Sequence, residues 1–304
     1  MEIEFNRIYL SSFKISYEIK EKTIINKYEF VQLFRGAFGM RLGQMSCQNF
    51  NEKYCDTCGE DCPYREIFAN PCKINPYSIS PADYGSDNIT VFSGSTMSFY
   101  FTLYGDKVKY LLYCLIAFER INKLCDIPVR LKKVSAIDIK YGKEEIIYET
   151  TNRMAINKSF PFSLSDAVEI SKNLSSNTVR IKFLTPLFLT SGKKMMTPEN
   201  FSAEILLKRI IERLKNISYY YCDVKFSKRY DFNVKVKDGE LYTTTCPGRK
   251  SLSGQIQYFG GLMGEVQLEE VPDEIMPVIV FAEYMGVGKD TAFGMGKMKV
   301  DTGY

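Results

Sequence analysis

The sequence contains no histidine and no tryptophan among its 304 residues. Without an imidazole, a serine or cysteine nucleophile has no histidine to activate it, so catalytic triads of the Ser-His-Asp type are excluded. Zinc hydrolases with histidine ligands, including those with a helical HExxH motif, are excluded for the same reason. Any catalysis must therefore depend on lysine, arginine, tyrosine, serine, cysteine or acidic residues.

Long apolar runs are also missing. The longest ones, near residues 110–118 and 276–282, are shorter than the roughly 18 residues that a membrane-spanning helix needs. The first ten residues, MEIEFNRIYL, lack the basic start and the apolar centre of a signal peptide. We therefore expect a cytoplasmic protein that does not insert into a membrane.

Neither sign of charge dominates the composition. There are 40 lysines and arginines against 36 acidic residues, a net charge of +4. This balance permits an anionic partner without requiring one, because local clustering of charge decides nucleic-acid binding. At roughly 150 residues per domain, the length predicts two domains.

The hydrophobic pattern alternates between the period of a strand and that of a helix. In the first part of the chain it predicts strands within 2–18, 88–104 and 128–150, and helices over 27–46 and 106–124. The strand-like segments EIEFNRIYL and SFKISYEI within 2–18 are expected to pair with each other, and Ser93-Gly94-Ser95 is expected to join two strands. In the second part it predicts strands at 179–184, 253–258, 262–269 and 294–300, and helices at 165–174, 197–217 and 272–286, with Gly260-Gly261 as a hinge.

Each half thus reads strand, helix, two strands, helix, strand. This order predicts an α+β fold of two tandem ferredoxin-like (RRM-like, βαββαβ) domains. We place the N-terminal domain at residues 1–160, with a cysteine-rich, metal-binding insertion at 47–87. The C-terminal domain is placed at 175–304, with a glycine-rich loop at 286–297.

Five of the nine cysteines lie close together, at Cys47, Cys55, Cys58, Cys62 and Cys72. A tetrahedral metal needs four converging ligands, and a CxxC turn presents two of them without strain. The alternative is a set of free buried cysteines, but the polar flanking residues are not those of a core. We predict structural Zn²⁺ at Cys47, Cys55, Cys58 and Cys62. An iron–sulfur cluster is the alternative, because Cys62-Pro63 ends like a ferredoxin motif.

The segment GVGKDTAFGMGK, residues 286–297, is rich in glycine and carries two lysines. It follows an expected helix and enters an expected strand, so it is not a P-loop, which has the opposite order. A loop that exposes backbone amides and lysines suits a phosphodiester backbone. The alternative is a tight turn that needs positive φ angles.

The same segment, GVGKDTAFGMGKMKV, resembles the C-terminal signature of the CRISPR-associated endoribonucleases of the RAMP (repeat-associated) superfamily, which process precursor guide RNA. Further similar segments are Arg249-Lys250, the stretch from Gly260 to Val266, Thr185-Pro186-Leu187, and the helix with Arg209 and Arg213. Near the N-terminus, the stretch from Leu33 to Gly39 resembles the family's first helix. Cys47, Cys55, Cys58 and Cys62-Pro63-Tyr64 are similar to a cysteine knuckle in one branch of the family.

The resemblance implies two ferredoxin-like domains that bind CRISPR repeat RNA and cleave the precursor (pre-crRNA) without a metal. The 2′-hydroxyl would attack the adjacent phosphate and leave a 2′,3′-cyclic phosphate. Many members use a histidine near the first helix, which this chain lacks. Tyrosine and lysine would have to substitute, with slow or single-turnover cleavage. The candidates on and after the first helix are Arg35, Arg41, Lys53, Tyr54 and Tyr64.

The expected RNA contacts are basic residues, loop glycines and one aromatic ring: Lys193, Lys194, Lys228, Arg229, Arg249, Lys250, Gly286, Gly288, Lys289, Phe293, Gly294, Gly296 and Lys297. Two other functions stay open at this point. One is a non-catalytic RNA-binding subunit of a CRISPR effector complex, which the absence of histidine favours. The other is a small metal or redox protein centred on the cysteines. The sequence also leaves open whether the chain forms a homodimer.

Overall fold

The structure is a computed structural model. It describes residues 2–47, 50, 61–83, 85, 87–172, 177–192, 194–228, 230, 233–246 and 258–301. The chain divides into two compact units. The N-terminal unit is Ser11–Pro161, and the C-terminal unit combines Met1–Leu10 with Phe162–Tyr304. The expected domains were 1–160 and 175–304, whereas in the structure the first ten residues group with the second unit.

The N-terminal unit is built on a sheet with the order β3-β5-β1-β7. Numbered along the chain as 1 to 4, these strands follow the order 2-3-1-4, and one helix follows each of strands 1 and 3. This is the βαββαβ arrangement of the ferredoxin-like fold. The elements are β1 (Tyr9–Ile19), β2 (Thr23–Asn26), α2 (Lys27–Ser46), α3 (Pro63–Ile67), β3 (Tyr77–Pro81), β4 (Asn88–Val91), β5 (Thr96–Tyr104), η1 (Gly105–Tyr110), α4 (Leu111–Glu119), β6 (Lys123–Leu124), β7 (Ile127–Asp138) and β8 (Lys143–Glu149).

Helix α2 occupies the predicted range, 27–46. Asn26 caps its first turn, where the side-chain oxygen accepts from the amides of Tyr28 and Glu29. The apolar face then packs through Phe34, whose ring centroid lies 4.0 Å from that of Phe99 on β5 and 5.4 Å from that of Phe118 on α4. Close aromatic packing between both helices and the sheet forms the core of this unit.

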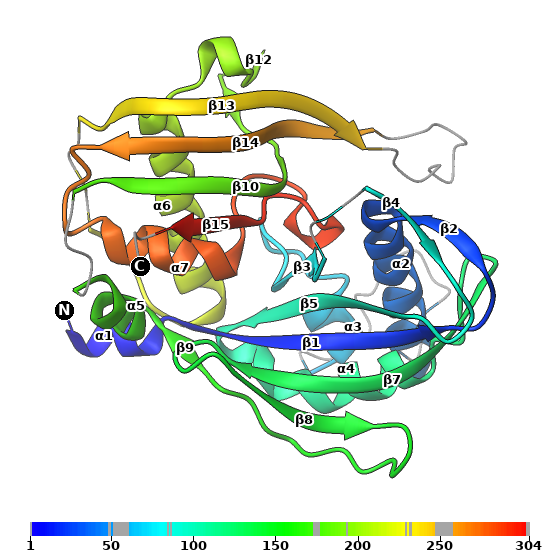
Figure 1. Ribbon diagram of the computed structural model, residues 1–304. Coiled ribbons are helices and arrows are strands. Elements are labelled where there is room, and N and C mark those ends of the chain that lie inside the picture. The colour runs from blue at the N-terminus through cyan, green and yellow to red at the C-terminus, as the bar shows by residue number, and fades with distance from the viewer. Residues whose placement is uncertain are drawn as a thin grey trace. The chain divides into compact units, whose positions relative to one another are not determined.

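The C-terminal unit repeats the topology. Its sheet has the order β13-β14-β10-β15, and α6 passes behind these strands with α7 beside it (Figure 1). The elements are α1 (Glu2–Arg7), β9 (Phe162–Ser163), α5 (Leu164–Ser171), β10 (Val179–Leu187), β11 (Thr190–Ser191), β12 (Lys194–Met195), η2 (Pro198–Asn200), α6 (Ala203–Tyr221), β13 (Lys235–Cys246), β14 (Phe259–Glu269), α7 (Met276–Met285), η3 (Thr291–Phe293) and β15 (Met298–Asp301). None of the helices in the described ranges is both long and apolar enough to cross a membrane.

Several sequence predictions are wrong. The strand that precedes β14 in the C-terminal sheet is β13, at 235–246, and not the predicted 253–258, of which residues 253–257 lie outside the described residues. Residues 2–18 do not form two paired strands: α1 comes first and a single strand, β1, follows. Helix α1 is held by contacts distant in sequence, because Phe5 packs on Phe226 at 6.0 Å between ring centroids. Gly260-Gly261 is not a hinge but lies inside β14, where a Cβ at Gly261 would overlap the backbone of Leu187.

The predicted helix of 197–217 also begins later than expected. Pro198–Asn200 is a short 3₁₀ turn. The α-helix starts at Ala203, capped by the Ser202 hydroxyl, which accepts from the Ile205 amide at 3.3 Å. Both hydroxyl residues offer a cap, so the sequence alone did not distinguish them.

Candidate functional site

The glycine-rich loop, residues 286–297, joins α7 to β15. Its four glycines all have positive φ: 72° at Gly286, 77° at Gly288, 94° at Gly294 and 70° at Gly296. A Cβ at Gly288 would lie 2.5 Å from the carbonyl oxygen of Phe188, and one at Gly296 would overlap the carbonyl oxygen of Val287. The tight-turn interpretation therefore accounts for all four glycines.

The loop is bonded tightly to the end of β10. The amide of Gly296 donates to Pro186 at 3.0 Å, and that of Lys297 donates to the Thr185 hydroxyl at 2.8 Å. The amide of Lys289 donates to Phe188 at 3.3 Å. The expectation that the loop exposes its amides is wrong for these residues, and the Thr185-Pro186-Leu187 segment and the loop form one folded element.

Arg213 on α6 is hydrogen-bonded to both ends of the segment from Met285 to Thr291. It was not among the predicted site residues. It is 8% exposed. Its guanidinium donates to the carbonyl of Met285 at 3.3 Å and to the hydroxyl of Thr291 at 2.7 Å. The available signal was its spacing with Ile210 and Ile217, which places an arginine on the apolar face of α6.

The two lysines of the loop differ in environment. Lys289 is exposed, with its ammonium 5.3 Å from the ring centroid of Phe188. Lys297 turns into the unit, where its ammonium donates to the carbonyl of Glu283 at 2.6 Å. Burial lowers the pKa of Lys297, and the nearby Glu283 carboxylate only partly opposes this. Lys289 is thus the loop lysine that is available to an external anion.

The other predicted RNA contacts lie in varied surroundings. Phe293 stacks on Phe259 at 5.3 Å. Lys194 is exposed on β12, whereas Lys228 forms an ion pair with Glu274 at 3.0 Å. Lys193, Arg229, Arg249 and Lys250 lie outside the described residues.

Two of the catalytic candidates meet at a single phenylalanine of the N-terminal unit. The Arg35 guanidinium lies 4.6 Å from the centroid of the Phe68 ring. The Tyr64 ring stacks on the same ring at 5.7 Å with an interplanar angle of 21°. We call Arg35, Phe68 and Tyr64 the cation–aromatic cluster. It brings a permanent positive charge and a phenol together from α2 and the α3 region.

Glycines of α2 make room for this cluster. A Cβ at Gly39 would overlap the Phe68 ring, and one at Gly43 would overlap the ring of Phe50. Phe50 in turn contacts Tyr64 edge to face at 5.3 Å. Close approach of an aromatic ring to the helix therefore explains Gly39 of the RGAFG segment and also Gly43 one turn later.

Arg41 is not part of the cluster: it donates to Gln44 at 3.1 Å and to Asn122 at 3.2 Å. Lys53 and Tyr54 lie outside the described residues. Tyr77 on β3 is fully buried and was missed by the sequence analysis. Burial raises the pKa of Tyr77 to about 12, although the nearby Arg35 charge opposes the shift. Its phenol therefore stays protonated at neutral pH.

One cysteine of the predicted metal site, Cys62, lies beside the residue that precedes another, Cys47. Cys47 caps the end of α2, and Cys62 caps the start of α3. The Cys62 sulfur lies 3.6 Å from the carbonyl oxygen of Ser46, although sixteen positions separate them. Cys55 and Cys58 lie outside the described residues. Within the described ranges, no three potential ligands converge on one point.

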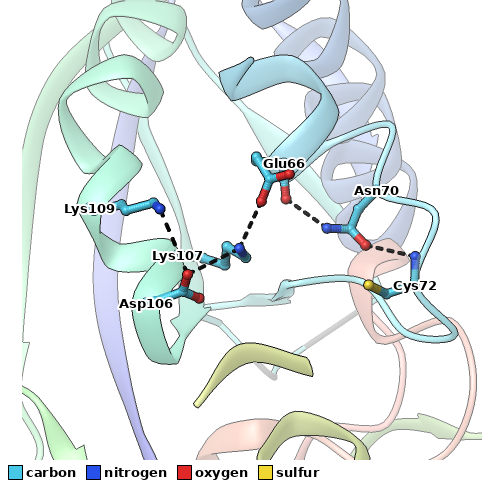
Figure 2. A network of polar contacts seen from close by, with 6 residues as sticks. All are labelled: Glu66, Asn70, Cys72, Asp106, Lys107 and Lys109. Atoms are coloured by element: carbon cyan, nitrogen blue, oxygen red, sulfur yellow. Dashed lines mark hydrogen bonds and ion pairs between the residues drawn. The ribbon is translucent and has the colours of Figure 1, made fainter. Parts of the chain in front are cut away.

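An ion network around the buried Lys107 attaches α3 to the rest of the unit. Figure 2 shows Lys107 of η1 between Glu66 of α3 and Asp106, at 2.8 Å and 3.2 Å. Asn70 extends the network, since its amide donates to the Glu66 carbonyl and its oxygen accepts from the Cys72 amide (Figure 2). Through α3, this network positions both Tyr64 and Cys62.

Residues 181–298 match the family model of the CRISPR-associated endoribonuclease Cas6. The chain contains a Cas6-family domain. This domain includes Arg213, the glycine-rich loop and the end of β10 to which the loop is bonded. A second family model, AF_1859_N, described as an N-terminal domain, matches residues 8–159, half of the chain, so the chain also belongs to that family.

Solved Cas6 structures share the fold around the Cas6-family domain. Thermus thermophilus Cas6 is 14% identical, with a TM-score of 0.57 over 97% of this chain and 99% of that one. A Cas6 product complex is 15% identical, with a TM-score of 0.58 over 96% and 100%. A chain of a partial Cas6-RT-Cas1–Cas2 complex matches at 14% identity, with a TM-score of 0.57 over 97% of this chain. That chain is longer, and the match covers only 46% of it. These likenesses show a shared Cas6-type, tandem ferredoxin-like fold.

An uncharacterized protein of Archaeoglobus fulgidus is similar along nearly the whole length. It is 21% identical over 291 residues, which cover 88% of this chain and 90% of the relative. The likeness thus extends beyond the Cas6-family domain to both units.

Proposed function

We propose that the protein binds CRISPR repeat RNA and cleaves pre-crRNA without a metal. The observation that carries the proposal is the cation–aromatic cluster in a chain with a Cas6-family domain. The cluster supplies two of the groups that RNA cleavage needs, a cation for the charged phosphorane and a proton for the leaving oxygen.

In the proposed reaction the 2′-oxygen attacks the adjacent phosphorus, its proton passes to solvent water, and the bond from phosphorus to the 5′-oxygen breaks; water then reprotonates Tyr64. The products are a 2′,3′-cyclic phosphate and a 5′-hydroxyl. The Arg35 guanidinium stabilises the developing negative charge, and the Tyr64 phenol donates its proton to the departing 5′-oxygen. Phenols and guanidinium groups are poor bases near neutral pH, so the attacking hydroxyl is weakly activated and turnover is slow.

The exposed lysines of the C-terminal unit are assigned contacts with RNA phosphates. Lys289 and Lys194 are exposed cations there, and both would pair with phosphates. Lys297 would act indirectly, by holding the loop against Glu283. Association with other CRISPR proteins is part of the proposal, supported by the likeness to Cas6 chains in Cas6-RT-Cas1–Cas2 complexes.

Single-turnover cleavage of the cognate repeat RNA in EDTA tests the catalytic assignment. We expect Arg35→Ala to lower the cleavage rate by about 100-fold or more, and Tyr64→Phe by about 100-fold. Repeat RNA should bind both variants within a few-fold of the wild-type affinity. Arg130→Ala and Tyr113→Phe are matched controls at exposed positions of the same unit and should cleave at the wild-type rate.

The same assay decides between the enzyme and a non-catalytic RNA-binding subunit. The specific observation that favours the second function is the absence of histidine. Tight binding without cleavage at a large excess of enzyme would establish the binding subunit and refute the enzyme. Cleavage that survives EDTA but is unaffected by Arg35→Ala and Tyr64→Phe would refute the residue assignment alone.

We also propose structural Zn²⁺ held by Cys47, Cys55, Cys58 and Cys62. The Cys62 sulfur lies beside the residue that precedes Cys47, which supports this assignment because the ligands of a zinc site must converge on one point. Zinc would tie the end of α2 to the start of α3 and would have no part in the chemistry.

Metal analysis of the purified full chain tests the zinc site. We expect one zinc per chain, lost in Cys62→Ser and retained in Cys125→Ser, a matched control at an exposed cysteine. Chelation should lower the thermal stability of the wild type, and the protein solution should be colourless before and after it. Iron with a visible absorption band would indicate the iron–sulfur alternative, and a metal-free wild type would contradict both.

A further inference from the structure

The N-terminal unit contains a cavity that the proposed cleavage chemistry does not use. It has a volume of about 280 Å³ and lies between the first turns of α2 and the strands β1, β3, β4 and β5. Its walls are mostly apolar and include Phe30, Val31, Ile89 and Val91. A cavity of this size with apolar walls and a few polar groups is typical of a small binding site.

One charged side chain in this cavity is buried. Lys27 is 4% exposed, and its ammonium donates to the carbonyl of Gly85 at 2.7 Å and pairs with Asp87 at 3.0 Å. An ammonium has three N–H donors, and these contacts use two of them. Lys27 is also the first residue of α2, where the helix dipole disfavours a cation. The Asp87 carboxylate and the Tyr28 ring, whose centroid lies 5.1 Å from the ammonium, offset part of the cost of burying this charge, and an acceptor for its third N–H would offset more of it.

The rim of the cavity carries groups that match the rest of a nucleotide. Lys14 lies there, and its ammonium is paired with Glu144 at 2.8 Å. The exposed carboxylate of Asp83 is on the same rim and accepts from the Gly85 amide at 2.9 Å. Cationic, anionic and flat apolar surfaces thus converge on one small volume.

We propose that this cavity binds one unpaired guanine base of the repeat RNA. The base would lie against Phe30 and the β4 side chains, with its oxygen and ring-nitrogen acceptors facing Lys27. Guanine fits best because its N7 and O6 atoms are paired acceptors, which lysine donors recognise, while Asp83 can accept from its opposite edge. Lys14 would pair with a neighbouring phosphate. The inference rests on the proposed RNA binding but not on cleavage.

The test measures affinity for repeat RNAs in which each unpaired guanine in turn is replaced by an abasic nucleotide. In the wild type we expect one position at which this replacement weakens binding by about 10- to 100-fold. Val91→Trp fills the cavity from β4 and should bind the intact and the abasic RNA equally. Ile24→Trp is the matched control, because Ile24 lies on the paired strand β2 but is 72% exposed; it should retain the wild-type difference.

Lys27→Met, which keeps the length of the side chain, covers the case in which Val91→Trp does not fold. It should bind RNA with guanine or adenine at the sensitive position equally well, whereas the wild type should prefer guanine. If the wild type binds repeat RNA but every abasic replacement weakens binding as much in these variants as in the wild type, the guanine site is refuted and RNA binding stands. If the wild type does not bind repeat RNA, the proposed function fails first and the guanine site fails with it.

Discussion

Replacing Gly296 with alanine is expected to destabilise the C-terminal unit by more than about 3 kcal/mol. Two independent costs combine at this position. The backbone has φ of 70°, which an alanine adopts at a cost of about 1 kcal/mol or more. In addition, the new Cβ would overlap the carbonyl oxygen of Val287, a backbone atom of the residue whose amide donates to the Gly296 carbonyl at 2.8 Å.

Urea unfolding of the full chain measures this effect, and Gly192→Ala is the matched control. Gly192 has a similar φ of 60°, but nothing lies within 4 Å of its would-be Cβ. The control should therefore lose only about 1 kcal/mol. Equal losses in the two variants would mean that the loop is not packed against itself as described. Affinity for repeat RNA should fall with stability in Gly296→Ala and should stay unchanged in the control.

The helices of both units were predictable from the sequence because they depend on local periodicity, but the second strand of each sheet, β3 in one unit and β13 in the other, was not predicted. The recurrence of Phe30, Phe34, Phe38 and Leu42 defines one face of a helix, and α2 occupies the predicted range. The same reasoning failed for residues 2–7, where alternation suggests a strand. There the deciding contacts are Phe5 with Phe226 and Arg7 with Asp223, between residues more than 200 positions apart. Such tertiary contacts override local preference and leave no periodic signal.

The candidate site was predictable in outline but not in detail. The glycine-rich loop and the RGAFG segment stand out in the sequence, yet the reason for each glycine is a neighbour from another segment, such as Phe188 for Gly288 and Phe68 for Gly39. Lys289 and Lys297 are alike in type and context, and only the fold shows that Lys297 is turned toward Glu283. Arg213 was missed as a site residue because an arginine in a helix is usually exposed.

The ion network around Lys107 has the second large expected effect. Lys107→Met should destabilise the N-terminal unit by about 3 kcal/mol, because removing one partner leaves the Glu66 carboxylate unpaired. The Lys107 side chain is only 9% exposed and that of Glu66 is 21% exposed, so water compensates little. Because Glu66 anchors α3, the cleavage rate should fall more than RNA affinity does.

Lys109→Met is the matched control for this variant. Lys109 lies 3.8 Å from the same Asp106, but its side chain is 54% exposed, so its loss should change stability by no more than about 0.5 kcal/mol.

The network also predicts a pH dependence. Burial lowers the pKa of Lys107, but the hydrogen bond that its ammonium donates to Glu66 and the charge of Asp106 outweigh it, so the folded-state pKa is raised above 10.5. This stabilisation is therefore complete at neutral pH and declines only as the pH rises past about 10.5. Thermal unfolding of both variants from pH 7 to 11 measures it: the gap between them should narrow at the alkaline end, and a constant gap would show that charge on Lys107 is not its source.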